Sequence, residues 1–212
     1  MTIGLFETVV YHDSTGTRGY DVNYLNPFIF YRPVEFALGS SGGNVLIGMN
    51  AKYQLTKNAY AYGQFLLDEL KVDEFFGATG WWANKYSWQL GFKSFNTFIP
   101  NLMLQSEVNY SRPYTYTHRT ALQNYAHYNQ ALAHPLGANF IESITNIHYL
   151  SPKRWFAELQ IMYALQGRDE PEENWGSDVY LSYNTREQEY DNEVLQGNAT
   201  SIFSPISNWA IF

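Results

Sequence analysis

The sequence predicts an all-β fold, an antiparallel transmembrane β-barrel with about eight long strands. Three observations predict it. Segments of about 10 to 12 residues alternate between apolar and polar side chains, which is the period of a β-strand. Short turns alternate with long loops along the chain. Aromatic residues make up 18% of the chain, and so many amphipathic rings suit either the girdles at the two interfaces of a membrane barrel or a carbohydrate-binding surface.

The clearest pair of strands spans Asn44 to Asp68. Every second residue from Val45 to Leu55 is apolar, and the alternation resumes at Ala59 after a turn at residues 56–58. Each strand has roughly 11 residues, which fits the roughly 9–11 that a tilted strand needs to cross a bilayer and exceeds the roughly 5–6 of soluble strands. We therefore expect a membrane-spanning hairpin here.

The other strands follow the same pattern and make a single domain over residues 1–212. We expect them at residues 2–11, 85–93, 101–110, 139–149, 155–166 and 198–212, the last interrupted at Pro205. Short turns fall at 56–58, 95–100 and 150–154, and long loops at 12–43, 69–83, 111–138 and 167–196. Outer-membrane barrels have short periplasmic turns and longer extracellular loops, so the long loops are expected to be extracellular.

The first long loop contains an aromatic run with embedded charges, FIFYRPVEFAL at residues 28–38. Breaker signals flank it in the segments 13–21 and 39–43 and at Asn26-Pro27, and a further one, Arg32-Pro33, lies within it. We expect this run to be a loop that folds inward or caps the barrel, with an extra short strand as the alternative.

The inward faces of the expected strands carry many long polar side chains. Eight strands could close a minimal barrel, but its narrow lumen would be crowded by them, so we expect a portion of a wider barrel. They are Lys52, Gln64, Asp68, Lys85, Lys93, Gln105, Glu107, Glu142, His148, Glu158 and Gln160.

Composition excludes several classes of protein. The net charge of −7 argues against a nucleic-acid partner, and the absence of cysteine excludes disulfides and thiolate metal sites. No apolar run has the roughly 18 residues of a transmembrane helix. The chain starts in a strand-like segment at Met1 without a signal peptide, and we therefore expect a mature or truncated piece of an outer-membrane protein.

Three segments resemble a known family. They are YLNPFIFYRPVEFALGSSGGNVLIGMNAKYQL at 24–55, YAYGQFLLDELKVDEF at 60–75 and GWWANKYSWQLGF at 80–92. They look like the outer-membrane barrels of Bacteroidota related to the gliding motility protein RemB, and more distantly like the Wzi capsule-assembly barrels. The resemblance covers most of the chain and is generic after about Tyr110. It implies an outer-membrane location, a barrel with more strands, and a role in surface polysaccharide or gliding without enzymatic activity.

The best ligand candidates lie at the start of the fourth expected strand, residues 85–93. Trp81 and Trp82 offer indole faces for stacking on a sugar, and Asn84 and Lys85 offer polar groups for its hydroxyl or acidic substituents. The alternative is that the two tryptophans are interface anchors of the barrel.

A second set of candidates carries charge into the lumen. Arg32 and Glu35 are expected to form an inward ion pair next to Asp68 or Lys85, with Gln64 as a further lumen residue. These residues have two possible roles. One is a salt-bridge network that packs the loop into the barrel, and the other is a polar ladder for sugar hydroxyls and carboxylates.

Other constellations favour ordinary structural roles. Asp68 and Glu69 should point to opposite faces of a strand, so they are not expected to form a catalytic pair. His118, His127 and His134 have no metal-ligand spacing and are expected to be solvent-exposed. The acidic segment 169–178 is expected to be a solvated loop, with Ca²⁺ binding as the alternative. We therefore expect no enzyme activity, no cofactor and no metal.

Two functions fit these patterns. The first is a non-enzymatic outer-membrane barrel for surface polysaccharide attachment or gliding. The second is a transport pore or a scaffold subunit of a larger secretion or motility complex. Expected partners are outer-membrane lipid and lipopolysaccharide, surface polysaccharide and other outer-membrane proteins. A soluble β-barrel binding protein is a third alternative.

Overall fold

The computed structural model describes residues 1–12, 21–25, 27–28, 31–38 and 43–211. Eight long strands, of 9 to 14 residues each, account for most of the described chain. They are β1 (Thr2–Val10), β2 (Asn44–Thr56), β3 (Ala59–Glu69), β4 (Lys85–Phe95), β5 (Leu102–Ser111), β8 (Phe140–Leu150), β9 (Trp155–Arg168) and β10 (Asn198–Ile211). The prediction of eight long alternating strands is therefore confirmed.

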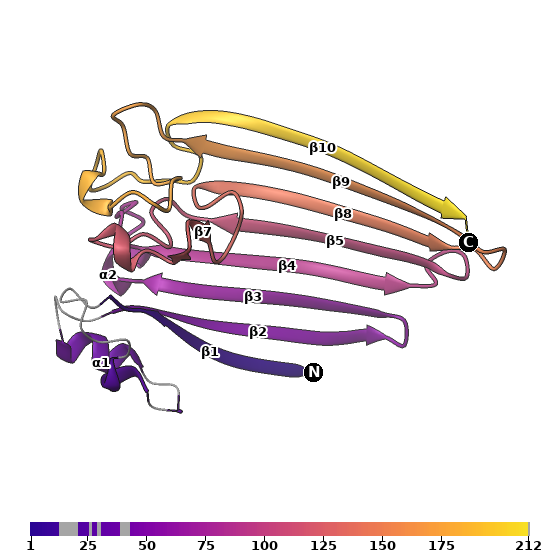
Figure 1. Ribbon diagram of the computed structural model, residues 1–212, viewed down its shortest axis with the longest axis horizontal. Helices are drawn as coiled ribbons and strands as arrows, with labels where there is room; N and C mark the ends of the chain where they lie inside the picture. Colours follow the sequence, from indigo (N-terminus) through magenta and orange to yellow (C-terminus); the bar gives the residue numbers. More distant parts are fainter. Residues whose placement is uncertain (13–20, 26, 29–30, 39–42, 212) are drawn as a thin grey trace.

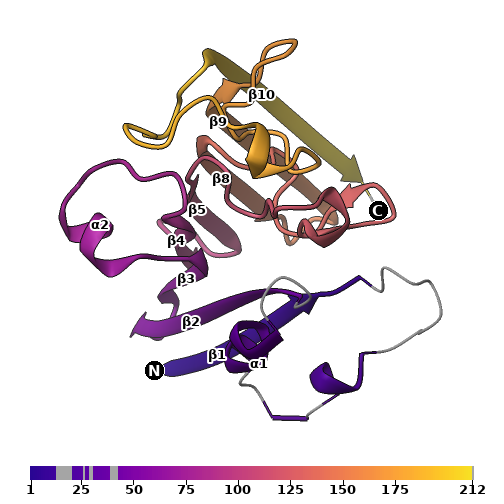
Figure 2. The same cartoon turned by 90° about the vertical axis from the view of Figure 1, so that its left-hand side faces the viewer.

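The strands form one antiparallel sheet in the order β1-β2-β3-β4-β5-β8-β9-β10, so each long strand pairs with the next along the chain. The sheet curves into an arc that stays open between β1 and β10, and among the described residues these two strands do not pair (Figure 2). The eight strands thus do not by themselves close into a barrel, and the expectation that they are a portion of a wider barrel stays a prediction. All short turns lie at one end of the sheet and all long connections at the other (Figure 1).

The hairpin of β2 and β3 is present as predicted, with a two-residue turn at Lys57 and Asn58. Pro205, by contrast, does not interrupt the last strand, because β10 runs continuously through it. β10 is an edge strand among the described strands, and an edge strand is where a sheet tolerates proline.

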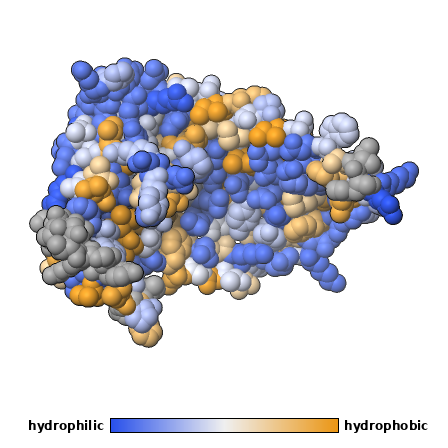
Figure 3. Space-filling view, in the orientation of Figure 1, coloured by the Kyte–Doolittle hydropathy of each residue, from blue (hydrophilic) through white to orange (hydrophobic). Residues whose placement is uncertain are grey.

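The two faces of the sheet differ in polarity. Residues that face each other across neighbouring strands project from the same side of the sheet, so the register assigns each residue to a face. Polar residues predominate along the middle of the concave face, as Figure 3 shows. The opposite, convex face presents exposed apolar side chains from most strands: Ile3, Leu5, Met49, Phe65, Leu90, Phe92, Ile161, Tyr163 and Phe203.

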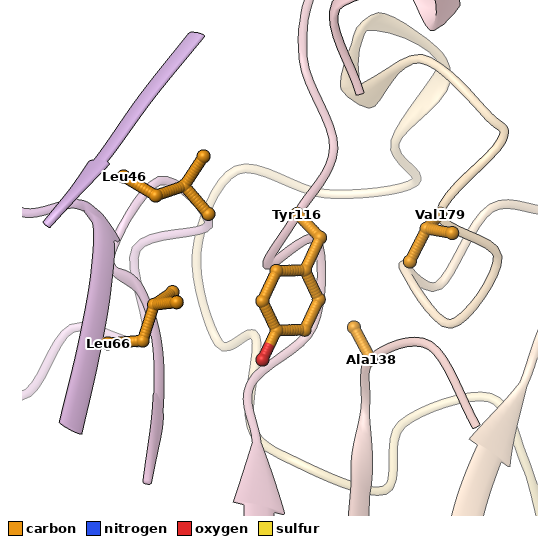
Figure 4. Packing of buried hydrophobic residues seen from close by; sticks show 5 residues of the cluster. All are labelled: Leu46, Leu66, Tyr116, Ala138 and Val179. Carbon is orange, nitrogen blue, oxygen red and sulfur yellow. The ribbon is translucent and has the colours of Figure 1, made fainter. Parts of the chain in front are cut away.

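Long connections cover the concave face at one end of the sheet. The connection between β5 and β8 contains a 3-10 helix (Ala121–Gln123) and a small hairpin of β6 (Ala126–His127) and β7 (Gln130–Ala131). Figure 4 shows the buried core that results, in which side chains from two strands meet side chains from two connections. The core consists of Leu46, Leu66, Tyr116, Ala138 and Val179.

The aromatic run of the first connection contains a helix, α1 (Tyr31–Leu38), instead of the loop or short strand predicted for it. Pro33 suggests a helix break, but it lies in the first helical turn, where its missing N–H has no acceptor to lose. The carboxylate of Glu7 accepts hydrogen bonds from the backbone N–H groups of Tyr31 (2.8 Å) and Arg32 (2.9 Å) and so stabilises the positive end of the helix. Most of the flanking breaker segments, 13–20 and 39–42, lie outside the described residues.

The remaining short helices are in the connections. They are a 3-10 helix at Val22–Tyr24, α2 at Val72–Phe76 and a 3-10 helix at Tyr183–Thr185. No helix among the described residues is long and apolar enough to span a membrane.

Candidate functional site

A buried ion pair joins the sheet to the connections above it. Lys85 Nζ lies 3.2 Å from Asp68 Oδ1, and both side chains are only 1% exposed. Glu69 Oε2 lies 3.4 Å from the same ammonium group. The prediction that Asp68 and Glu69 point apart is therefore wrong, because the register shifts between Leu67 and Glu69 and this irregularity turns both carboxylates towards Lys85.

The ion pair also holds the connection between β5 and β8. Lys85 Nζ donates a hydrogen bond to the carbonyl oxygen of Thr117 at 3.0 Å. Asp68 Oδ2 accepts one from the backbone N–H of Tyr116 at 2.9 Å. We call Asp68, Lys85, Tyr116 and Thr117 the clamp. Both charges of the clamp are thus satisfied by polar groups of the connection, which fixes it against the concave face.

Asn84 and the two tryptophans lie beside the clamp. Asn84 is buried, and its side-chain oxygen accepts a hydrogen bond from the backbone N–H of Lys71 at 2.9 Å. The Trp82 ring contacts Tyr183, with ring centroids 4.6 Å apart, and the guanidinium of Arg186, which lies 4.3 Å from the Trp82 centroid. Trp82 therefore packs the last long connection onto the sheet, a contact that neither sequence-based interpretation described.

Trp81 lies next to Trp82, with 6.0 Å between the ring centroids. The ammonium of Lys71 lies 5.2 Å from the Trp81 ring centroid. Both tryptophans are partly exposed.

Two of the three loop histidines are partly buried, which corrects the expectation that all are solvent-exposed. Burial lowers the pKa of His118 to about 4, and the positive charge of Lys85 adds to the effect. His134 Nε2 lies 3.0 Å from Glu142 Oε2. Only His127 is exposed.

Arg32 and Glu35 form the predicted ion pair, with 2.6 Å between Nη1 and Oε2, but they do so on one turn of α1. The backbone of Val45 engages both side chains: its carbonyl accepts from Arg32 at 3.1 Å and its N–H donates to Glu35 at 3.4 Å. The pairing of β2 with β3 starts only at Ile47, so these side chains bond main-chain groups beyond the end of that ladder. Burial raises the pKa of Glu35.

A cavity of about 270 Å³ lies between the concave face and the connection from β5 to β8. Its floor contains Gln64, Gln89 and Asn109, which face one another in register across β3, β4 and β5. The row continues to Glu142 on β8, whose carboxylate accepts a hydrogen bond from Asn109 Nδ2 at 2.8 Å. The floor is therefore a ladder of carboxamides.

Aromatic rings and a histidine form the walls of the cavity. Tyr116 and Tyr125 stack with 6.1 Å between centroids, and the Tyr116 hydroxyl donates to Ser87 Oγ at 2.8 Å. The His134 ring stacks on Phe140 with 4.4 Å between centroids. Burial raises the pKa of Tyr116 to about 12, so its hydroxyl keeps the proton that it donates.

Of the eight candidate ligand residues, only Gln64 lines this cavity. Asp68 and Lys85 belong to the clamp instead, and Asn84, Trp82 and Trp81 lie beside it. Arg32 and Glu35 bind the backbone of Val45 in β2. Strand alternation already places Gln89 and Asn109 on the inward face beside Gln64. The floor of the cavity could therefore have been predicted from the sequence. The wall residues come from an irregular connection, and no periodicity indicates their position.

Possible metal ligands do not cluster in the described part of the chain, where no group of three or more His, Cys, Asp or Glu could hold an ion. The acidic segment is organised by Asp169. Its carboxylate accepts hydrogen bonds from the backbone N–H groups of Trp175, Ser177 and Asp178.

Comparisons with protein-family models, curated proteins and solved structures found no match.

Proposed function

We propose that the chain is a portion of the wall of an outer-membrane β-barrel that attaches surface polysaccharide or supports gliding, without enzymatic activity. The exposed apolar side chains along the convex face carry this proposal. Leu5 is 66% exposed, Leu90 61% and Phe203 64%, although each lies in a strand of the sheet. Exposed apolar surface on this scale marks a lipid or protein interface, and in a barrel wall it is the face that contacts lipid.

Strand length and the polar concave face support the same proposal. Strands of 9 to 14 residues are long enough to cross the hydrocarbon core when tilted. Apolar-out and polar-in alternation is the pattern of a membrane barrel with an aqueous interior. Among the described residues, no strand pairs with the outer edges of β1 and β10. In a bilayer these backbone groups must be paired, and a wider barrel would supply the partners.

The clamp favours attachment over a transport pore. Two long connections are packed onto the concave face through the buried core and the Lys85–Asp68 pair. Moving these connections off the concave face to widen a channel would expose a buried ion pair and five core residues. With these connections in place, the concave face presents polar and aromatic side chains to a bound polymer.

Neighbouring residues of β9 test the membrane location. Ile161 lies on the convex face and Gln160 on the concave face. In cells that produce the full-length protein, Ile161→Arg should reduce the amount found in the detergent-extracted outer-membrane fraction, because an arginine facing lipid near the bilayer midplane costs about 2–4 kcal/mol. Gln160→Arg should leave that amount unchanged. Equal amounts of the two variants in this fraction would contradict the proposal. Release of the wild-type protein from the membrane by salt without detergent would also contradict it.

The attachment role is tested by the tryptophans beside the clamp. Cells in which Trp81 and Trp82 are both replaced by alanine should retain less surface polysaccharide at equal protein level in the outer membrane. Trp209→Ala is the matched control, since Trp209 is 77% exposed on the convex face. Unchanged retention in the double variant would count against polysaccharide attachment at this site.

A further inference from the structure

We propose that the cavity above the carboxamide floor binds a single uncharged pyranose ring. This inference rests on the proposed function, because it specifies which part of a surface polysaccharide this chain holds. Three properties of the cavity lead to it: the lack of charge in its lining, the free carboxamides of its floor, and its size.

The lining offers no charge to a ligand. None of the described residues that line the cavity is Lys, Arg, Asp or Glu. His134 is engaged at both ring nitrogens, since Nε2 contacts Glu142 and Nδ1 accepts from the backbone N–H of Leu136 at 3.2 Å. Glu142 lies directly behind Asn109 and His134, so its negative charge disfavours a carboxylate in the cavity. A charged sugar would lose hydration there without gaining a counter-charge.

The floor offers hydrogen bonds that the protein does not use. The carboxamides of Gln64 and Gln89 make no hydrogen bond to any other residue that the structure describes, and they face each other across β3 and β4. Each carboxamide has two donors and an acceptor, which matches the mixed donor and acceptor character of a sugar hydroxyl. Two adjacent carboxamides can therefore bind neighbouring hydroxyl groups of one ring.

The walls suit the other side of such a ring. A pyranose presents apolar C–H groups on its faces, and the stacked rings of Tyr116 and Tyr125 supply a flat apolar surface beside the floor. Leu66 and Tyr116 belong to both the cavity and the buried core, so this wall is rigid (Figure 4). The volume of about 270 Å³ lies just below the range of about 300–1,000 Å³ for drug-sized ligands, which fits one ring and not a longer segment.

Equilibrium dialysis with labelled monosaccharides tests this proposal. The full-length protein in detergent micelles would be dialysed against the methyl glycosides of glucose, galactose and mannose, and against those of glucuronic and galacturonic acid. At least one neutral glycoside should bind, and the two uronic acid glycosides should bind at least about tenfold more weakly, a difference of about 1.4 kcal/mol. Tighter or equal binding of the acidic glycosides, or binding of none, would overturn the proposal.

Variants of the floor locate the site. Gln64→Ala and Gln89→Ala should each weaken binding about 3- to 10-fold, the usual effect of losing one neutral hydrogen bond. Gln160→Ala is the matched control, because Gln160 lies on the same face but outside the cavity. If both floor variants bind like the wild type, the sugar occupies another site. Sugar binding by a protein that fails the membrane test refutes only the proposed function, and membrane insertion without sugar binding refutes only this inference.

Discussion

Replacing Lys85 by methionine removes the positive charge of the clamp while keeping most of the side-chain volume. Asp68 then stays buried, with a side chain 1% exposed, and keeps only the hydrogen bond from Tyr116. Removing one partner of a buried ion pair typically costs about 3–5 kcal/mol, because the remaining charge is desolvated without compensation. The carbonyl of Thr117 also loses its donor, so we expect the upper part of this range.

The measurement is the midpoint of urea unfolding in detergent micelles, together with the rate of protease cleavage within residues 112–138. The double variant Lys85→Met with Asp68→Asn should recover about 2 kcal/mol or more of the lost stability, because the asparagine is neutral and its side-chain oxygen still accepts the bond from Tyr116. Lys71→Met is the control, since Lys71 pairs with Glu74 at the surface and is 54% exposed. Its unfolding midpoint should equal that of the wild type.

A loss below about 1 kcal/mol in Lys85→Met would refute the reasoning, because that is the size of an exposed ion pair. Failure of Asp68→Asn to restore stability would also refute it. In that case the lysine would act through packing, and the charge of Asp68 would not be the source of the loss.

Three further predictions concern other contacts. Gly91→Val should destabilise the sheet by about 1–3 kcal/mol in urea unfolding, because a Cβ at Gly91 would meet the Tyr62 ring at 2.2 Å. Gly63→Ala should lower the free energy of unfolding by less, because a Cβ at Gly63 would meet its nearest atom, on Leu90, at 3.0 Å. Lowering the pH from 7 to 5 should loosen the connection around His118. The pKa of His118 is below its usual value, so the neutral imidazole contributes fully to the free energy of unfolding above about pH 6.5. As the pH falls towards 4, this free energy decreases by up to about 1.4 kcal/mol per pH unit. Hydrogen-exchange protection factors, which are corrected for the pH dependence of the intrinsic exchange rate, should show this loss in the wild type but not in His118→Gln. Equal protection factors at both pH values would contradict it. Glu7→Gln should expose α1 to protease by weakening its N-terminal end by about 1 kcal/mol, and an unchanged cleavage rate would show that the carboxylate is dispensable.

The sheet was predictable because its strands carry a period of two over long stretches. That period gave the hairpin of β2 and β3, the face of each residue and the division into short and long connections. Alternation alone did not predict the openness of the sheet, because it describes a strand and its faces but not the closure of a sheet. The expectation of a portion of a wider barrel came from the crowding of the inward side chains, and it stays a prediction. The resemblance to RemB-type and Wzi-type barrels stays a prediction.

The clamp depends on contacts that strand alternation does not predict. Lys85 and Asp68 were recognised as inward residues, but Glu69 was assigned to the other face because strict alternation ignores a register irregularity. The partners in the connection, Tyr116 and Thr117, lie about 30 to 50 residues away in sequence, and only tertiary packing brings them to the strands. The helix around Pro33 was missed because the proline was read as a breaker without regard to its place in the first turn.

The direction of the two outermost strands limits what can complete the sheet. β1 runs from the short-turn end towards the long connections, and β10 runs back towards the short-turn end (Figure 1). Strands that bridge β10 to β1 with every neighbour antiparallel must therefore come in an even number, whichever polypeptide supplies them. A barrel built on this sheet has an even total of strands, and the first added strand next to β10 must point towards the long connections.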